Sequence, residues 1–424
     1  MPSPPDPSAG TPCRLCGTPG AVRRFLDLGP QPLGNAFLPP AEIAGEAEYP
    51  LVMGVCAACH LVQIVDPAPP EATNRVYRNY SYVPTGETLT RHYRALAADL
   101  LEVVRPPSGS RFLDIGSNDG LFLRSIRERL EDARVLGVEP SGRIAEIAER
   151  SGIPTIHGFF DAACAGEVGR RLGAIQVASA TQVLQHIRDP AALLRSVRDL
   201  LAPDGVLLLE GRAYFPDVAA KVSFDTFYHE LLYCFTLHSL ERLLGNTGFA
   251  VFHAEHHDVY GGSLRVFAQR ADTGTRPVRP SVDAIRAAEV AAGVTGFDAY
   301  AAFARQSASV RERLRTMVTG LAADGATLAG YGAPSTGTTL LRYCGLDRDV
   351  LRYIVDDNPL KQGLLTPGTH VPIVPSRQLA DDPPDYVLVI AWRLREEIIG
   401  RLAPLEGKRI KGIVVPLPSP ELVR

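Results

Sequence analysis

Two cysteine pairs near the N-terminus each have two residues between their members. Cys13 and Cys16 form the first pair, and Cys56 and Cys59 form the second. Each pair can present two thiolates from one tight turn, and four thiolates complete the tetrahedral shell of a structural zinc ion. A redox dithiol is the alternative, but neither pair lies in a thioredoxin-like strand–helix–strand pattern. We therefore predict a structural Zn²⁺ held by Cys13, Cys16, Cys56 and Cys59, with the other three cysteines as ordinary thiols.

A turn rich in glycine and acidic residues follows the apolar segment FLDI and precedes LFLRSIRERL. Dinucleotide enzymes use G-x-G-x-x-G to seat a pyrophosphate, whereas this turn reads DIGSNDG and carries two carboxylates. Another carboxylate, Glu139, ends the next apolar segment, where it can bind a ribose diol. This pattern favours S-adenosylmethionine as cofactor. The predicted cofactor-binding residues are Asp114, Gly116, Asn118, Gly120, Glu139, Phe159, Thr181 and Gln182.

A second turn of this type, GYGAPSTG at 330–337, also follows a predicted strand and precedes a predicted helix. Asp356 and Asp357 end the next strand. The pattern is typical of a Rossmann-like nucleotide site. The alternative is an inherited scaffold whose crevice is unused.

Apolar strands alternate with helical segments from RFLDIGS at 111–117 to VLLLEGR at 206–212, and again after residue 326. Such alternation indicates parallel sheets covered by helices. AVFHAEH and SLRVFAQR are expected to close the first sheet as an antiparallel pair. We predict an α/β chain of three domains: a zinc ribbon (1–70), a Rossmann-like methyltransferase sheet (71–272) and a C-terminal Rossmann-like domain (273–424).

Composition limits the partners of this chain. Its 424 residues carry 44 Lys and Arg against 47 Asp and Glu, so the net charge is -3. A nearly neutral chain lacks the basic footprint that nucleic acid or an anionic membrane surface requires. There is no signal-like N-terminus and no apolar run long enough for a membrane span. We expect a cytoplasmic protein, a monomer, with a small-molecule partner.

With these motifs in order, the sequence resembles the family of S-adenosylmethionine-dependent C3-methyltransferases that act on nucleotide-linked deoxysugars in antibiotic biosynthesis. The resemblance covers nearly the whole chain. Its matching segments are CRLCG, DLGPQPLGNAFL, VCAACHLVQI, FLDIGSNDGLFL, VEPS, FYHELLYCFTLHSLERLL, YGGSLRV, GYGAPSTGTTLL, DDNPLKQG, PGTHVPI and DYVLVIAW.

This resemblance implies methylation at C3 of a TDP-4-keto-2,6-dideoxyhexose. The 4-keto group acidifies the C3 hydrogen, a base removes it, and the enolate carbon attacks the cofactor's methyl group. The resemblance implies Tyr82, His186, Tyr228 and Glu230 as catalytic residues. The expected substrate-binding residues are Tyr80, His229, Tyr260, Ser335, Thr336, Asp357, Lys361 and Trp392.

The chain departs from the family pattern at three positions. Leu231 stands where the family has the histidine proposed as base, Tyr260 replaces another polar residue, and Thr336 replaces a lysine. Lys361 and Arg393 can compensate for that lysine at a diphosphate. Loss of the usual base leaves two alternatives open: a bifunctional enzyme that also, or instead, reduces the 4-keto group with NADPH, and an inactive ligand-binding relative.

Overall fold

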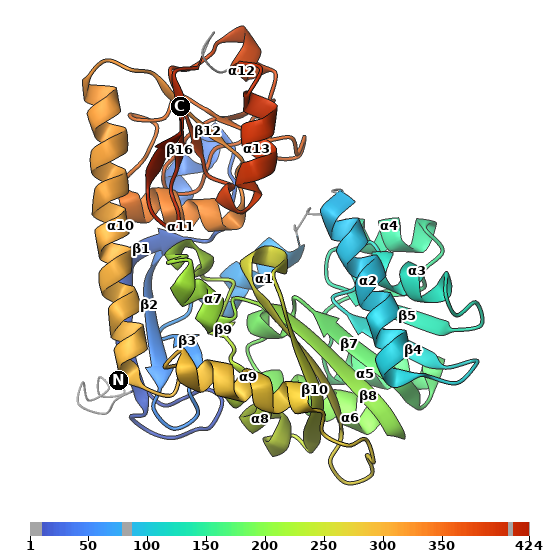
Figure 1. Cartoon of the computed structure of the whole chain (residues 1–424). Coiled ribbons are helices and arrows are strands. Elements are labelled where there is room, and N and C mark those ends of the chain that lie inside the picture. The colour runs from blue at the N-terminus through green and yellow to red at the C-terminus, as the bar shows by residue number, and fades with distance from the viewer. Residues whose placement is uncertain (1–10, 79–86, 406–409, 424) are drawn as a thin grey trace, which may run out of the picture.

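The computed structural model describes residues 11–78, 87–405 and 410–423. Within them the chain forms three β-sheets, and helices cover the second and third (Figure 1). The predicted α/β class, with two sheets made mostly of parallel strands, is confirmed. None of the described helices is both long enough and apolar enough to span a membrane.

The N-terminal sheet contains β1 (Val22–Pro32), β2 (Glu48–Cys56) and β3 (Val62–Ile64), all antiparallel. Its fourth strand, β9 (Tyr233–Cys234), comes from the middle of the chain and pairs with β3. The proline-rich segment PAPPEATN contains the start of helix α1 (Pro70–Arg78). A proline suits the first position of a helix because the N–H it lacks would have no partner inside the helix there.

The central sheet has the strand order β10-β11-β8-β7-β4-β5-β6. As expected, its last two strands in sequence are antiparallel and form one edge. Its strands are β4 (Arg111–Ile115), β5 (Arg134–Glu139), β6 (Thr155–His157), β7 (Ile175–Thr181), β8 (Leu201–Arg212), β10 (Phe249–His257) and β11 (Ser263–Arg270). The helices of this part are α2 (Glu87–Val104), α3 (Leu121–Arg127), α4 (Gly142–Arg150), α5 (Ala162–Leu172), α6 (Pro190–Leu200), α7 (Phe215–Ala220) and α8 (Leu237–Asn246).

The C-terminal sheet has the order β14-β13-β12-β15-β16-β17, with the last pair antiparallel. Its strands are β12 (Leu328–Tyr331), β13 (Ile354–Val355), β14 (Ile373–Val374), β15 (Tyr386–Val389), β16 (Gly412–Val415) and β17 (Glu421–Val423). The helices are α11 (Ser335–Cys344), α12 (Gln378–Asp381) and α13 (Arg395–Leu402). Two more, α9 (Pro280–Ala291) and the long α10 (Phe297–Ala323), lead from the central sheet to this one (Figure 1).

Aromatic rings pack where the N-terminal sheet, the central part and α10 meet. Phe25 of β1 lies 5.3 Å from Tyr300 of α10, measured between ring centroids, and 6.2 Å from Phe215 of α7. The rings of Phe215 and Tyr300 stack at 4.3 Å. Apolar burial at this junction fixes the N-terminal sheet against the rest of the chain.

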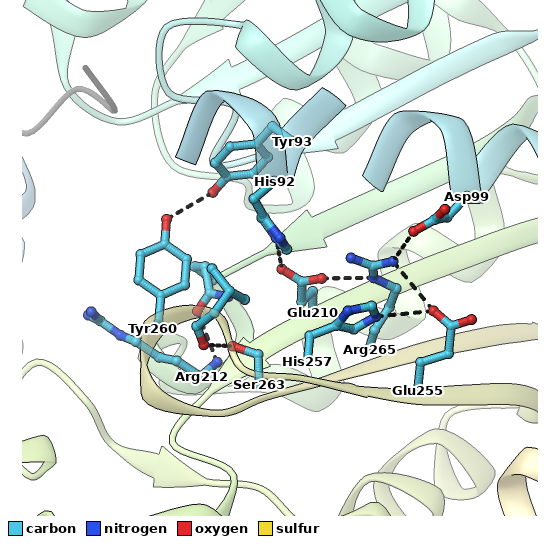
Figure 2. Close-up of polar contacts among 12 residues, drawn as sticks. His92, Tyr93, Asp99, Glu210, Arg212, Glu255, His257, Tyr260, Ser263 and Arg265 are labelled. Carbon is cyan, nitrogen blue, oxygen red and sulfur yellow. Dashed lines mark hydrogen bonds and ion pairs between the residues drawn. The ribbon is translucent and has the colours of Figure 1, made fainter. Parts of the chain in front are cut away.

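A buried ionic network holds α2 on the central sheet (Figure 2). The Arg265 side chain, 1% exposed, donates to Glu210 Oε2 at 2.8 Å and to Asp99 Oδ2 at 2.8 Å. His92 of α2 contacts the other Glu210 oxygen at 2.7 Å. Burial alone would raise the pKa of Glu210, but His92 and Arg265 bring it below its ordinary value. The carboxylate is therefore charged, and it joins a helix to the β8–β11 ladder.

We expect Arg265→Met to destabilise the protein by about 3–5 kcal/mol, because a buried carboxylate at Glu210 would lose its cation. The matched control is Arg91→Met, which removes an exposed pair with Glu87 that should contribute less than about 0.5 kcal/mol. Urea unfolding followed by circular dichroism measures both. Equal midpoints for the two variants would show that the network contributes little to stability.

Candidate functional site

A cavity of about 2790 Å³ lies where the three parts of the chain meet. One wall is the edge of the central sheet at which its parallel strands end. The loop after β1 forms a second wall, and the turn between β12 and α11 forms a third. Both glycine-rich turns predicted from the sequence therefore open into the same space.

The first turn lies between β4 and α3, and its shape requires glycine at a tight point. Gly116 has φ 71°, and a Cβ placed there would lie 2.4 Å from Val183 Cγ2. Asn118 N donates to Glu139 Oε2 at 3.1 Å, and Ser141 N donates to Glu139 Oε1 at 2.9 Å. The carboxylate that ends β5 is thereby fixed in the cavity wall.

Polar atoms at this end of the cavity fit a ligand. Ser117 Oγ and Gln182 Nε2 are buried and have no hydrogen-bond partner among the described residues. Both residues line the cavity, as do Asp114, Gly116, Asn118, Glu139, Phe159 and Thr181. Gly120 is absent from that wall; its φ of 77° lets α3 begin. Buried donors and acceptors without partners are rare, so a polar ligand such as S-adenosylmethionine suits this wall.

Burial raises the pKa of two carboxyl groups of this wall, Asp114 and Glu139, to about 7. Asp114 also accepts a hydrogen bond from Ser179 Oγ at 2.7 Å, which opposes the shift. The charge on Glu139 adds to the rise at Asp114. At neutral pH these groups are therefore close to half ionised, and a ligand that needs carboxylate acceptors shifts them to the charged form.

The second end of the cavity brings together three of the predicted catalytic residues. His186 in η2 (Leu184–His186), Tyr228 and Glu230 all line it. Tyr80 and Tyr82 lie outside the described residues. Glu230 does not present a free carboxylate, because its oxygens accept from Gly34 N at 3.0 Å and from Asn35 N at 2.9 Å.

The tautomer of His186 follows from its partner. Nδ1 contacts the backbone carbonyl oxygen of Glu230, which can only accept, so Nδ1 carries the proton. Nε2 is left with its lone pair. Burial, followed by the positive charge of Arg212, lowers the pKa of His186 to about 3. The ring is therefore neutral at pH 7 and is a base with one defined acceptor atom.

His229 and Leu231 do not line the cavity, unlike their neighbours Tyr228 and Glu230. His229 is fully buried, is absent from the cavity wall, and directs Nε2 to the carbonyl oxygen of Tyr49 at 3.0 Å. Leu231 is buried in the apolar core. The structure thus separates His229 from the other predicted substrate-binding residues that it describes, all of which line the cavity.

Two residues that line the cavity, Arg212 and Tyr93, were not predicted from the sequence. Arg212 ends β8 and donates to the Tyr228 hydroxyl. The hydroxyl of Tyr93, on α2, lies 3.4 Å from that of Tyr260 in η4 (Val259–Gly261) (Figure 2). The rule that ligands bind at the carboxyl ends of parallel strands would have pointed to Arg212. Tyr93 has no comparable signal, since it reads as part of an amphipathic helix.

The segments that follow β12, β13 and β15 bring five predicted substrate residues to the opposite wall. These are Ser335, Thr336, Asp357, Lys361 and Trp392. Lys361 Nζ donates to the Ala333 carbonyl at 2.7 Å and lies 4.8 Å from the centroid of the Phe37 ring. Burial lowers the pKa of this ammonium group.

Arg393 is bound by the protein itself. Together with Trp392 it contacts the fully buried Asp225, through Nη1 at 2.8 Å and through the indole Nε1 at 2.9 Å. Arg393 Nη2 also donates to Thr226 Oγ1 at 2.7 Å. These contacts join the C-terminal part to η3 (Phe224–Thr226) of the central part.

The four predicted zinc ligands are gathered at one point. Their sulfur atoms all lie within 4.8 Å of one another. The Sγ atoms of Cys13 and Cys59 are 3.6 Å apart, as are those of Cys16 and Cys56. A tetrahedral ion with Zn–S bonds of about 2.3 Å requires sulfur separations of about 3.8 Å. The cluster therefore fits a structural zinc ion.

Cofactor affinity should depend on pH because Glu139 accepts ribose hydroxyls best when ionised. With a pKa of about 7, Glu139 should make S-adenosylhomocysteine bind up to about tenfold more weakly at pH 6 than at pH 8, and Asp114, whose pKa is also about 7, should add to this difference. Titration calorimetry measures this ratio. Glu139→Gln should weaken binding and reduce the pH dependence to the part that Asp114 contributes, whereas the exposed Glu149→Gln should leave the profile unchanged. A flat wild-type profile would contradict the prediction.

Comparisons with known proteins agree with this geometry. Residues 13–73 match a family model described as "Putative zinc binding domain", residues 89–254 match a methyltransferase domain, and residues 258–418 match a C-methyltransferase C-terminal domain. The ubiquinone biosynthesis O-methyltransferase of Ralstonia nicotianae is 25% identical over 114 residues, which are 26% of this chain and 46% of that protein. The crystal structure of magnesium protoporphyrin IX methyltransferase from Synechocystis PCC 6803 covers 48% of this chain and 99% of its own, with 15% identity and a TM-score of 0.35.

A full-length relative settles the family. The C-methyltransferase NovU of Streptomyces niveus is 34% identical over 415 residues, which are 97% of this chain and 96% of NovU. Because the match covers nearly the whole of both chains at 34% identity, the chain belongs to the S-adenosylmethionine-dependent C-methyltransferase family.

Proposed function

We propose that this protein transfers a methyl group from S-adenosylmethionine to C3 of a TDP-4-keto-2,6-dideoxyhexose. The observation that carries the proposal is the single cavity into which both glycine-rich turns open. A cofactor in the first turn and a nucleotide at the second would place a sugar between them. The sequence resemblance to deoxysugar methyltransferases supplies the substrate class.

In this proposal each part of the chain has one task. Residues 1–70 hold zinc and shape the sugar cleft, residues 71–272 bind the cofactor and carry the chemistry, and residues 273–424 bind the nucleotide. Bound S-adenosylmethionine supplies an electrophilic methyl group. Asp114 and Glu139 hold its amino and ribose groups, with Gln182 and Ser117 as additional hydrogen-bonding groups.

Proton removal from C3 falls to His186 in the absence of the family histidine at position 231. Its Nδ1 proton is held by the Glu230 carbonyl, which leaves the Nε2 lone pair as the acceptor. Glu230 acts by positioning, since its carboxylate bonds the loop after β1. Ser335, Thr336, Asp357 and Lys361 would contact the nucleotide and diphosphate.

The purified protein, incubated with methyl-labelled S-adenosylmethionine and a panel of TDP-4-ketosugars, should give a product labelled at C3. We expect His186→Asn to lower kcat by about 10²–10⁴-fold, as loss of a general base does. His256→Asn, an exposed histidine outside the cavity wall, should keep wild-type activity. Absence of C-methylated product from every ketosugar would contradict the proposed function.

The reductase alternative is tested by adding NADPH to the same mixtures. Under the proposed function NADPH is not consumed, and S-adenosylhomocysteine forms in step with C-methylated sugar. Consumption of NADPH with 4-ketosugar would show the bifunctional activity instead.

Metal analysis of the purified protein should find one zinc ion per chain. Cys56→Ser should lose the ion and lower the thermal midpoint, since a structural zinc site contributes directly to folding. Cys164→Ser removes a buried thiol on α5 outside the cluster and should keep the zinc. Stoichiometric zinc in Cys56→Ser would contradict the four-cysteine site.

A further inference from the structure

Arg212 places a guanidinium group at the end of the cavity that is lined by His186 and Tyr228. It is the last residue of β8, is partly exposed, and lines the cavity wall. Its Nη2 donates to the Tyr228 hydroxyl. The guanidinium carbon is 5.6 Å from the centroid of the Tyr228 ring and 6.0 Å from that of Tyr260. Figure 2 shows Arg212 beside Tyr260. Two aromatic residues of the wall thus hold this cation in place.

Hydrogen bonds also hold the backbone of Arg212 in place. Its N–H donates to Gln182 Oε1 at 2.9 Å, and β8 pairs Arg212 with Ser263 of β11. Gln182 also lines the cofactor end of the cavity. Arg212 therefore lies between the predicted cofactor wall and Tyr228, at the place where cofactor and sugar would meet.

The positive charge of Arg212 acts on His186. After burial, the Arg212 cation is the largest cause of the lowered pKa of His186. A cation beside a neutral base opposes protonation of that base at rest. The same cation stabilises the anion that forms when the base takes a proton, and it acts strongly in a wall of low dielectric.

We propose that Arg212 is a catalytic residue that binds the enolate oxygen derived from the C4 carbonyl of the substrate. The inference rests on the proposed function and deepens it. The C3–H bond breaks and its proton passes to His186 Nε2. The electron pair of that bond forms the C3–C4 double bond, and the π pair of the carbonyl moves to O4. The negative charge on O4 is then balanced by the Arg212 guanidinium, with Tyr228 held in the same contact.

This role accounts for a departure of the chain from its family pattern. Leu231 is buried and apolar, so the position of the family's histidine contributes no charge. A neutral base with a pKa as low as that of His186 is weak unless the anion it creates is stabilised. Arg212 supplies that stabilisation from the carboxyl end of the neighbouring strand.

Exchange of the C3 hydrogen with solvent isolates the enolisation step from methyl transfer. The probe is TDP-4-keto-2,6-dideoxyglucose in D₂O with S-adenosylhomocysteine and no methyl donor, followed by loss of the C3 proton signals in NMR. We expect Arg212→Gln to slow exchange by about 10²–10³-fold, the usual effect of removing one oxyanion donor, with KM changed by less than about threefold. The exposed Arg315→Gln on α10 is the control and should match wild type.

Arg212→Lys keeps a positive charge without the planar fork, so exchange should fall by about tenfold at unchanged KM. This variant carries the test if Arg212→Gln does not fold. Wild-type exchange in both variants would overturn the role of Arg212, as would a raised KM at an unchanged rate, which would assign Arg212 to the diphosphate. If the wild type neither exchanges C3 nor methylates the sugar, the proposed function fails, and this inference fails with it.

Discussion

The carboxylate of Glu230 fixes the loop at which the three parts of the chain meet. It is 1% exposed, and its oxygens accept from Gly34 N, Asn35 N and Asn35 Nδ2 at 2.9–3.2 Å. Burial raises the pKa of Glu230, and the three N–H groups oppose that rise. An unsatisfied carboxylate in such surroundings would cost several kcal/mol. Glu230, and Tyr228 beside it, can therefore keep their positions only when the loop after β1 donates its N–H groups to the Glu230 carboxylate.

The same loop also reaches the C-terminal part. Gly34 O accepts from Thr338 Oγ1 at 3.0 Å. A Cβ at Gly34 would lie 3.0 Å from both Ser335 O and Tyr228 Cδ2. The backbone of Gly34 therefore fills the space between the second glycine-rich turn and Tyr228. Glycine at this position is a packing requirement of the junction. It explains how the N-terminal sheet, whose strands lead to the four-cysteine cluster, comes to form part of the cavity wall.

Sequence patterns anticipated the features that depend on local order along the chain. Alternating strands and helices identified the two parallel sheets, and the cysteine spacing identified a cluster that the fold does assemble. Contacts between distant segments had no such signal. The two-residue strand β9 is too short for a periodic pattern, and its pairing with β3 joins residues far apart in sequence. Likewise, nothing local shows that Glu230 binds a loop or that Arg393 binds Asp225.

Local charge shows how a nearly neutral chain could hold the anionic nucleotide that we propose as its ligand. Arg393 forms a buried pair with Asp225, so most of its charge is balanced within the protein. Lys361 has a carbonyl oxygen and an aromatic face as its direct contacts, and burial lowers its pKa. A diphosphate beside Lys361 would restore that pKa, which means that the anion and the proton on Nζ stabilise each other. A desolvated ammonium group in the cavity wall would therefore attract such a ligand more effectively than a diffuse basic surface, because the low dielectric there strengthens the interaction.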